Sequence, residues 1–356
     1  MRPTQAKIHM YRLKENMELL REKSGQRTFL AVIKADAYGH GALRCLDYLY
    51  KQGIGHFGVA TFGEALELRA ANEDIFIMVL GATDPSDYEE AARKKIRLPI
   101  FDLASLEHYI SLKEKGPIHI KIDTGMHRLG FAPEEFKKHI EKIKKINPEG
   151  IYTHIARADE EDTSSAYGQI KRFNELVDYC DGQGLAFEFI HYANSATILH
   201  LDLGSTNMVR AGIALYGLAP DGKRSSGLRP VMSLHSKILS IREIPAGQGV
   251  SYGHTFIASR PSRIGTMPLG YADGYKRQMS RRARVYAAGS YLPQVGNITM
   301  DQTMVDLTGT NVMLYDEVEL MGEHISCEEL ALAAGTINYE IVTTLGKRVD
   351  REYIYE

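Results

Sequence analysis

Residues 29–37 read FLAVIKADA, a compact apolar run that predicts a buried strand. Similar runs follow along the chain, and amphipathic segments of helical length separate them. The predicted strands cover residues 29–37, 55–62, 75–82, 97–102, 118–125, 150–159, 187–194 and 208–217. Strands that are apolar on both faces and alternate with helices indicate a parallel sheet, because the crossover helices cover both of its faces.

Eight strands of this kind favour a closed (β/α)8 barrel over an open doubly wound sheet. An open nucleotide-binding sheet usually carries GxGxxG after its first strand, whereas Tyr-Gly-His-Gly stands here at 38–41. The predicted helices cover residues 7–24, 63–72, 86–95, 133–146 and 164–183. The first 220 residues are therefore predicted to form a (β/α)8 barrel.

The pattern changes after residue 220. Residues 221–230 (DGKRSSGLRP) have the composition of a linker, and alternating apolar and polar residues beyond it predict an antiparallel β domain. Two short helices are predicted at 325–335, with Ser326 as N-cap, and at 337–346. We expect a barrel domain at 1–225 and a β-rich domain at 226–356, and the first residues of the chain could pair with the latter.

The composition of the 356 residues is that of an ordinary globular protein. Lys and Arg number 43 and Asp and Glu 45, so the net charge of −2 offers no footprint for nucleic acid or an anionic membrane. There is neither an apolar run of membrane-spanning length nor a secretion signal at the N-terminus. The three cysteines are scattered and suggest neither a disulfide framework nor a metal site. We expect a cytoplasmic protein.

Functional residues of such barrels gather at the carboxyl ends of the strands. The sequence places these residues there: Lys34, Lys121, His154, His191, Asn194, Ser195 and Arg210. No HxH, HExxH or GxSxG pattern suggests a metal or a serine nucleophile. A desolvated lysine can attach covalently to a carbonyl group, and Ser195 with the Gly212 and Ile213 amides could bind a phosphate. Together they suggest pyridoxal phosphate (PLP) as cofactor.

Each of these residues also has a purely structural interpretation. Lys34 could be an ion-paired lysine at a strand end, and Ser195 could simply cap the helix that ATILH begins. His154 and His191 could be satisfied core histidines, and Arg210 could pair with Asp202. Only the ordered combination is informative.

The motif AVIKADAYGHG (31–41) resembles the PLP-lysine motif of alanine racemases. Further matches follow in order: KIDTGMHRLGF (121–131), THIARADE (153–160), HYANSAT (191–197), VRAGIALYG (209–217), VSYGHTF (250–256), GYADGYKR (270–277), VGNITMDQTMVDLT (295–308) and NYEIVTTLGKRV (338–349). The resemblance implies a PLP-dependent racemase that interconverts L- and D-alanine and supplies D-alanine for peptidoglycan. It also implies a head-to-tail homodimer in which each active site uses both subunits.

The resemblance assigns the cofactor site residue by residue. Lys34 would attach covalently to PLP, and Arg210 would face its ring nitrogen. The phosphate would be held by Tyr38, Ser195, Gly212 and Ile213. The remaining residues around the cofactor would be His154, His191 and Asn194.

Catalysis would need two bases on opposite faces of Cα, because racemisation removes a proton from one face and returns one to the other. Lys34 would serve one face and Tyr252 of the partner subunit the other. Arg128 and the Met300 backbone would hold the substrate carboxylate, and Lys121 matches a lysine that can be carbamylated to fix Arg128. The entrance would be lined by Tyr271 and Asp301 of the partner subunit.

Three residues depart from the family pattern: Ala211 replaces a usual proline, Lys347 stands where some members have a tyrosine, and Arg157 where a small residue is common. They leave open a racemase of serine or another amino acid. A PLP decarboxylase of the same fold would have an acidic residue in place of Arg210 and a cysteine in place of Tyr252. A non-catalytic PLP-binding barrel would lack the second domain.

Overall fold

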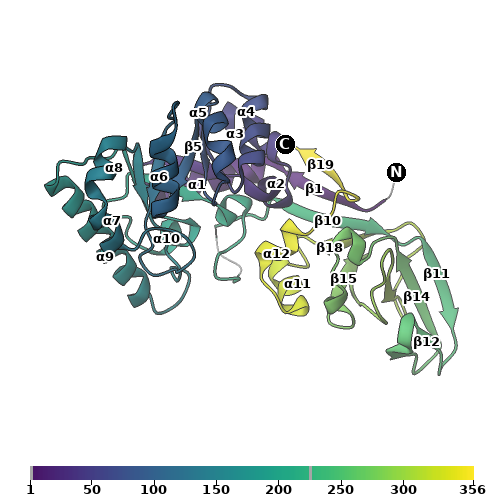
Figure 1. Cartoon of the computed structure of the whole chain (residues 1–356). Helices are drawn as coiled ribbons and strands as arrows, with labels where there is room; N and C mark the ends of the chain where they lie inside the picture. The colour runs from purple at the N-terminus through teal and green to yellow at the C-terminus, as the bar shows by residue number, and fades with distance from the viewer. Residues whose placement is uncertain (1–2, 224–226) are drawn as a thin grey trace. The chain divides into compact units, whose positions relative to one another are not determined.

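The computed structural model describes residues 3–223 and 227–356, and their contacts divide into two compact units (Figure 1). The barrel unit contains residues 16–37 and 42–215. The β unit contains residues 3–15, 38–41, 216–223 and 227–356. The predicted linker at 221–230 includes residues 224–226, which lie outside the described residues.

The barrel unit is built on eight parallel strands in the order β8-β7-β6-β5-β4-β3-β2-β9. The Asn207 N–H donates to the Ile190 carbonyl and the Arg210 N–H to the Ala193 carbonyl, both at 2.9 Å. These backbone hydrogen bonds join β9 to β8 and close the ring. The strands are β2 (Thr28–Val32), β3 (His56–Val59), β4 (Phe76–Val79), β5 (Ile96–Ile100), β6 (Ile118–Lys121), β7 (Gly150–Tyr152), β8 (Phe189–His191) and β9 (Met208–Ala211). This confirms the predicted (β/α)8 barrel.

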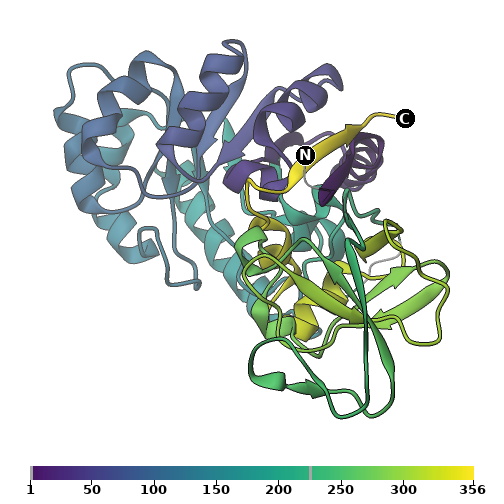
Figure 2. The ribbon, with the colours of Figure 1, turned by 90° about the vertical axis from the view of Figure 1, so that its right-hand side faces the viewer.

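Helices lie outside the ring of strands (Figure 2). They are α1 (Met10–Ser24), α3 (Ala42–Lys51), α4 (Phe62–Ala71), α5 (Tyr88–Arg93), α6 (Leu103–Ser111), α7 (Pro133–Lys138), α8 (Ile140–Ile146), α9 (Ser164–Gly182) and α10 (Ser195–His200). Helix α4 begins with a capping box, in which the Thr61 side chain and the Glu64 carboxylate accept each other's backbone N–H groups. The predicted helix at 133–146 is two helices, because the backbone leaves the helical conformation at His139.

Two predicted elements are wrong at one end. Residues 7–9 belong to β1 (Gln5–His9) and not to the predicted helix, since the alternating burial of Ala6 and Ile8 belongs to a strand. The predicted strand at 29–37 ends at Val32, and Lys34–Gly39 form a short helical element, α2. The other barrel strands likewise end earlier than predicted.

The β unit contains a six-stranded sheet in the order β16-β15-β18-β10-β1-β19, so the first residues of the chain pair with the C-terminal strand and with β10. A three-stranded sheet β11-β14-β17 and the pair β12-β13 complete it. The strands after β9 are β10 (Met232–Lys237), β11 (Ser240–Ile244), β12 (Gly249–Val250), β13 (Phe256–Ile257), β14 (Ser262–Met267), β15 (Arg284–Ala287), β16 (Ser290–Pro293), β17 (Thr303–Asp306), β18 (Glu317–Met321) and β19 (Asp350–Ile354).

Two helices of the β unit follow β18. They are α11 (Cys327–Ala334) and α12 (Asn338–Thr343). The Ser326 side chain accepts the Glu329 N–H, so its predicted role as N-cap of α11 is confirmed. Among the described residues, no helix is long and apolar enough to cross a membrane.

Candidate active site

The turn after β2 has an unusual backbone. Four consecutive residues, Ala35, Asp36, Ala37 and Tyr38, have φ between 50° and 54°, so α2 is left-handed. This conformation costs on the order of 1–2 kcal/mol per residue in L-amino acids, because Cβ crowds the following carbonyl. Strained backbone of this kind persists where the surroundings enforce it and is concentrated at functional sites. The left-handed turn therefore marks Lys34, its first residue, as functionally constrained.

Side-chain carboxylates hold this left-handed turn. Glu64 accepts the N–H groups of Ala35 and Ala60 at 2.7 Å each, and Asp36 accepts the Ala42 N–H at 2.7 Å. These bonds tie the first residues after Lys34 to the N-terminus of α4 and to the start of α3. Glu64 was not among the residues predicted to form the site. The Thr61–Glu64 capping-box spacing was a signal for a helix start, but not for a contact with residue 35.

Lys34 and Lys121 lie in an electropositive, desolvated environment. Burial lowers the pKa of Lys34, the Arg128 charge lowers it further, and Glu64 opposes the shift. Burial, then Arg128, Arg210 and Lys34, lower the pKa of Lys121 to about 8. An amine with a lowered pKa is more often neutral, and the neutral amine is the nucleophile and base. The barrel thus brings two predicted lysines and two predicted arginines together.

Arg210 is fixed by acceptors on both of its terminal nitrogens. Nη1 donates to His191 Nδ1 at 2.8 Å and to the His191 carbonyl at 3.1 Å, and Nη2 donates to the Thr153 carbonyl at 2.9 Å. No hydrogen bond within residues 3–223 and 227–356 uses the Arg210 Nε–H, which leaves one donor for a ligand. Burial lowers the pKa of Arg210 to about 10. The alternative ion pair with Asp202 is wrong, since Asp202 instead accepts the Gly204 N–H.

The two histidines beside Arg210 are neutral. Burial and the Arg210 charge hold the pKa values of His154 and His191 well below their usual range. A guanidinium only donates, so the ring nitrogens facing it, His154 Nδ1 at 3.3 Å and His191 Nδ1 at 2.8 Å, must be acceptors. The remaining proton of each ring is therefore on Nε2.

Ser195 does not have the capping role considered for it. Asn194 is the N-cap of α10, because its side-chain oxygen accepts the Thr197 N–H at 3.0 Å, and Ser195 is the first helical residue. The buried Ser195 hydroxyl instead accepts the N–H groups of Gly212 at 2.9 Å and Ala214 at 3.3 Å. The structure thus joins the ends of β8 and β9 through the serine that was predicted to bind phosphate.

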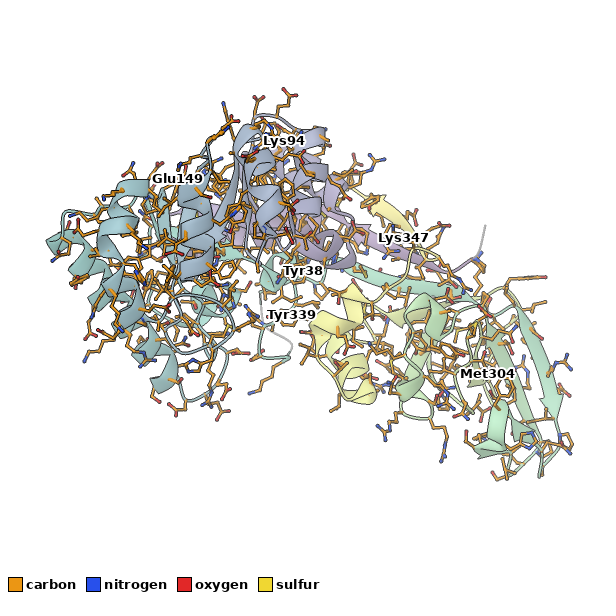
Figure 3. The ribbon with its side chains drawn as sticks, viewed as in Figure 1. Tyr38, Lys94, Glu149, Met304, Tyr339 and Lys347 are labelled. Carbon is orange, nitrogen blue, oxygen red and sulfur yellow. The ribbon has the colours of Figure 1, made fainter. Side chains whose placement is uncertain are left out.

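Tyr38 lies in an aromatic cluster of the β unit. Its buried ring is 5.0 Å from the ring of Tyr216 and 6.3 Å from that of Tyr339, centroid to centroid. Figure 3 labels Tyr38 and Tyr339, together with Lys347, whose side chain is exposed. Lys347 stands where some members of the family have a tyrosine, whereas Tyr339, which occurs in the quoted NYEIVTTLGKRV motif, was not predicted to lie near Tyr38. A partly buried tyrosine beside Tyr38 is the feature that the motif alone did not reveal.

The other predicted residues of the β unit lie in neighbouring loops. The Asn297 side chain donates to the Tyr252 carbonyl at 2.7 Å, and the Ala272 N–H donates to the Met300 carbonyl at 3.0 Å. Tyr252 is 77% exposed. The other exposed members of the set are Tyr271, Met300 and Asp301.

Three further positions have ordinary surroundings. Asp301 is paired with Arg348 at 2.6 Å, and Arg157 pairs with Glu160 on the surface. Ala211, at the position of a usual proline, keeps its place in the β2–β9 ladder opposite Ala31. Among the described residues, no group of three or more His, Cys, Asp or Glu could hold a metal ion.

The barrel carries a partly buried lysine with a lowered pKa beside a strained turn, and an immobilised arginine with neutral histidines lies nearby. These features indicate an enzyme that acts on amines. The family model for the N-terminal domain of alanine racemase matches residues 8–220, and that for the C-terminal domain matches residues 231–353. The chain belongs to the alanine racemase family, and the enzyme is an amino-acid racemase.

Individual relatives agree over the whole chain. The alanine racemase of Carboxydothermus hydrogenoformans is 38% identical, over 99% of this chain and 100% of that protein. The structure of the Streptomyces coelicolor alanine racemase has a TM-score of 0.94 at 34% identity, covering 99% of this chain and 98% of that one. The Bacillus anthracis alanine racemase with bound L-Ala-P has a TM-score of 0.92 at 35% identity, covering 99% and 95%.

Proposed function

We propose that this enzyme interconverts L- and D-alanine with PLP, using Lys34 on one face of Cα and Tyr252 of the partner subunit on the other. The observation that carries the proposal is the environment of Lys34: a lysine with a lowered pKa, held at a strand end by a strained turn among cationic groups. Family membership supports the reaction, and a relative with bound L-Ala-P supports a small substrate. The D-alanine would serve peptidoglycan synthesis in the cytoplasm.

The donors in the structure suit PLP. Lys34 supplies an amine for covalent attachment, and the Arg210 Nε–H is left to meet an acceptor such as a ring nitrogen. The phosphate would be held by Tyr38, Ser195, Gly212 and Ile213. An anionic cofactor also suits the electropositive surroundings of Lys34 and Lys121, because desolvated charges need partners. Further contacts would come from His154 and Asn194, and His191 would support Arg210.

When bound, PLP supplies an electron-withdrawing ring that makes the Cα proton of an attached amino acid removable. Lys34 then takes or gives a proton on its side, for which a lowered pKa is an advantage near neutral pH. Tyr252 does the same from the other side. Arg210 stays charged and only donates, so it cannot hand a proton to the ring nitrogen, and this restrains competing reactions.

Substrate binding and assembly complete the proposal. Arg128 and the Met300 backbone hold the substrate carboxylate, and a carbamate on Lys121 would fix Arg128. A pKa of about 8 favours that modification, because it needs a neutral amine. We propose that a barrel domain, residues 1–225, and a β-rich domain, residues 226–356, contribute to each site of a homodimer. The strongly exposed Tyr252 and Met300, large side chains at 77% and 52%, support a partner surface there.

The test is an assay of the purified protein with PLP and a panel of single L-amino acids, with chiral detection of the D-isomers. L-Alanine should give D-alanine faster than any other substrate, and D-alanine should give L-alanine. A faster reaction with L-serine or a basic amino acid would assign a different substrate. Release of CO2 and an amine without any D-isomer would overturn racemisation.

A further inference from the structure

A row of buried polar side chains runs through the barrel interior away from the substrate side. Beyond Arg210 and His191, His191 Nε2 lies 2.9 Å from His119 Nδ1, and His119 Nε2 lies 3.2 Å from Glu149 Oε2. Arg97 donates from Nε and Nη2 to the two Glu149 carboxylate oxygens, at 3.0 Å each. His119, Glu149 and Arg97 have no part in the mechanism above. The rings of His119 and His191 are completely buried.

The direction of every hydrogen bond in this row follows from one fact. A guanidinium only donates, so His191 Nδ1 must accept from Arg210, and the His191 proton is on Nε2. His191 Nε2–H therefore donates to His119 Nδ1, whose own proton must be on Nε2. His119 Nε2–H then donates to the Glu149 carboxylate, which only accepts. All three hydrogen bonds in the row therefore point the same way, from the buried Arg210 cation to the Glu149 anion.

The surroundings hold both imidazoles in this state. The His191 ring stacks on Tyr152 at 4.8 Å and 5°, and the His119 ring stacks on Phe189 at 5.7 Å and 15°. A Cβ at Gly150 would lie 2.5 Å from His119 Nδ1, so glycine leaves the space that the ring occupies. Burial opposes ionisation of Glu149, but the hydrogen bonds from His119 and Arg97 lower its pKa to about 2, so it is a carboxylate at neutral pH.

We propose that His119 and Glu149 are positioning residues: as acceptors further along the row they stabilise the His191 tautomer that Arg210 requires, and thereby hold the Arg210 guanidinium in its orientation toward its ligand. If His119 could not accept, the His191 proton could move to Nδ1 and face the Arg210 donor. Two donors would then oppose each other at a fully buried position, and Arg210 would lose one of the two contacts that hold Nη1. The inference rests on the proposed function only for the effect on turnover. The tautomers themselves are independent of it.

The experiment compares His119→Phe with the matched control His56→Phe. His56 belongs to the same aromatic layer, with its ring 4.7 Å from that of Phe76 and 6.2 Å from that of Phe189. It is not part of the row of hydrogen bonds from Arg210 to Glu149. Nitrogen-15 NMR of histidine-labelled protein without PLP reports which ring nitrogen is protonated, and replacement variants assign the signals. Racemase assays of the PLP-loaded proteins then give kcat and KM separately.

The wild-type protein should show His191 and His119 as neutral rings protonated on Nε2 alone. In His119→Phe the His191 signals should lose that single tautomer, and kcat should fall about tenfold with little change in KM, since a buried donor is left unsatisfied. His56→Phe should change neither readout. Glu149→Gln keeps an acceptor for His119 and lacks the charge. In this variant His191 and His119 should both stay protonated on Nε2, and the His119 Nε2 signal should shift.

Two results would overturn the proposal. One is a wild-type spectrum with His191 protonated on Nδ1, or with either ring doubly protonated. The other is a His119→Phe protein that keeps the His191 tautomer and a kcat within twofold of wild type. If His119→Phe does not fold, the wild-type and Glu149→Gln spectra still decide the question. A wild type without racemase activity but with the expected tautomers would reject the proposed function and leave the hydrogen-bond chain standing.

Discussion

Lys121 is predicted to destabilise the fold that contains it. It is only 5% exposed, and its pKa is lowered from 10.5 to about 8, chiefly by burial and then by Arg128 and Arg210. At about 1.4 kcal/mol per pKa unit, keeping this lysine protonated in the folded state costs about 3 kcal/mol near pH 7. Lys121→Met keeps the length of the side chain and removes the charge. The free energy of unfolding of the variant should therefore exceed that of the wild type by about that amount. The gain is reduced by the loss of the weak 3.5 Å hydrogen bond from Lys121 to the Leu80 carbonyl.

The pH dependence gives the prediction its sign. Between about pH 8 and 10.5 the unfolded chain binds more protons at Lys121 than the folded protein does, so wild-type stability rises with pH in this range. The advantage of Lys121→Met should accordingly shrink, to about 1.4 kcal/mol at pH 9.5. Below the folded pKa the advantage should be constant.

Urea unfolding of the protein without PLP, at pH 7 and pH 9.5, measures the difference. Buffers are kept free of CO2 and bicarbonate, since a carbamate on Lys121 would be an anion. Lys171→Met is the control: Lys171 is 78% exposed and lies 3.9 Å from Glu175, so its loss should change stability by less than about 0.5 kcal/mol. A Lys121→Met protein no more stable than wild type, or an advantage that grows with pH, would refute the reasoning.

The remaining predictions concern the two proposed bases. Lys34→Ala should abolish the absorbance band of covalently attached PLP near the edge of the visible range, and a surviving band would remove Lys34 from that role. Tyr252→Phe should lower racemisation by about 10²-fold or more while PLP binding persists, as expected for a lost acid–base group, and near-normal turnover in both directions would contradict the two-base scheme. Mixed Lys34→Ala and Tyr252→Phe dimers should recover about a quarter of wild-type activity, because random exchange leaves half of the dimers with one intact shared site. No recovery after proven subunit exchange would argue against shared sites.

Much of the barrel could be predicted because its signal is local. Apolar runs of strand length alternating with amphipathic helices are visible without any knowledge of contacts, and all eight predicted strands occur. The ends of the strands were less predictable. In FLAVIKADA the residues after Val32 are Ile, Lys, Ala, Asp and Ala, and no glycine or asparagine among them indicates the left-handed φ values of Ala35, Asp36 and Ala37. Contacts made far along the chain, such as the Glu64 carboxylate on the Ala35 N–H, decide that conformation.

Residue identity and order by themselves determined the class of fold, the lysine at the end of the first barrel strand and the family to which the chain belongs. Only the tertiary structure decided the protonation of these groups. Arg210, His191, His119 and Glu149 are far apart in sequence, and the direction of their hydrogen bonds follows from which nitrogen faces which partner. The pKa values of Lys34 and Lys121 likewise depend on burial and on charges brought close by folding. Electrostatic energies depend on distance and solvent exposure, and neither is encoded in local sequence.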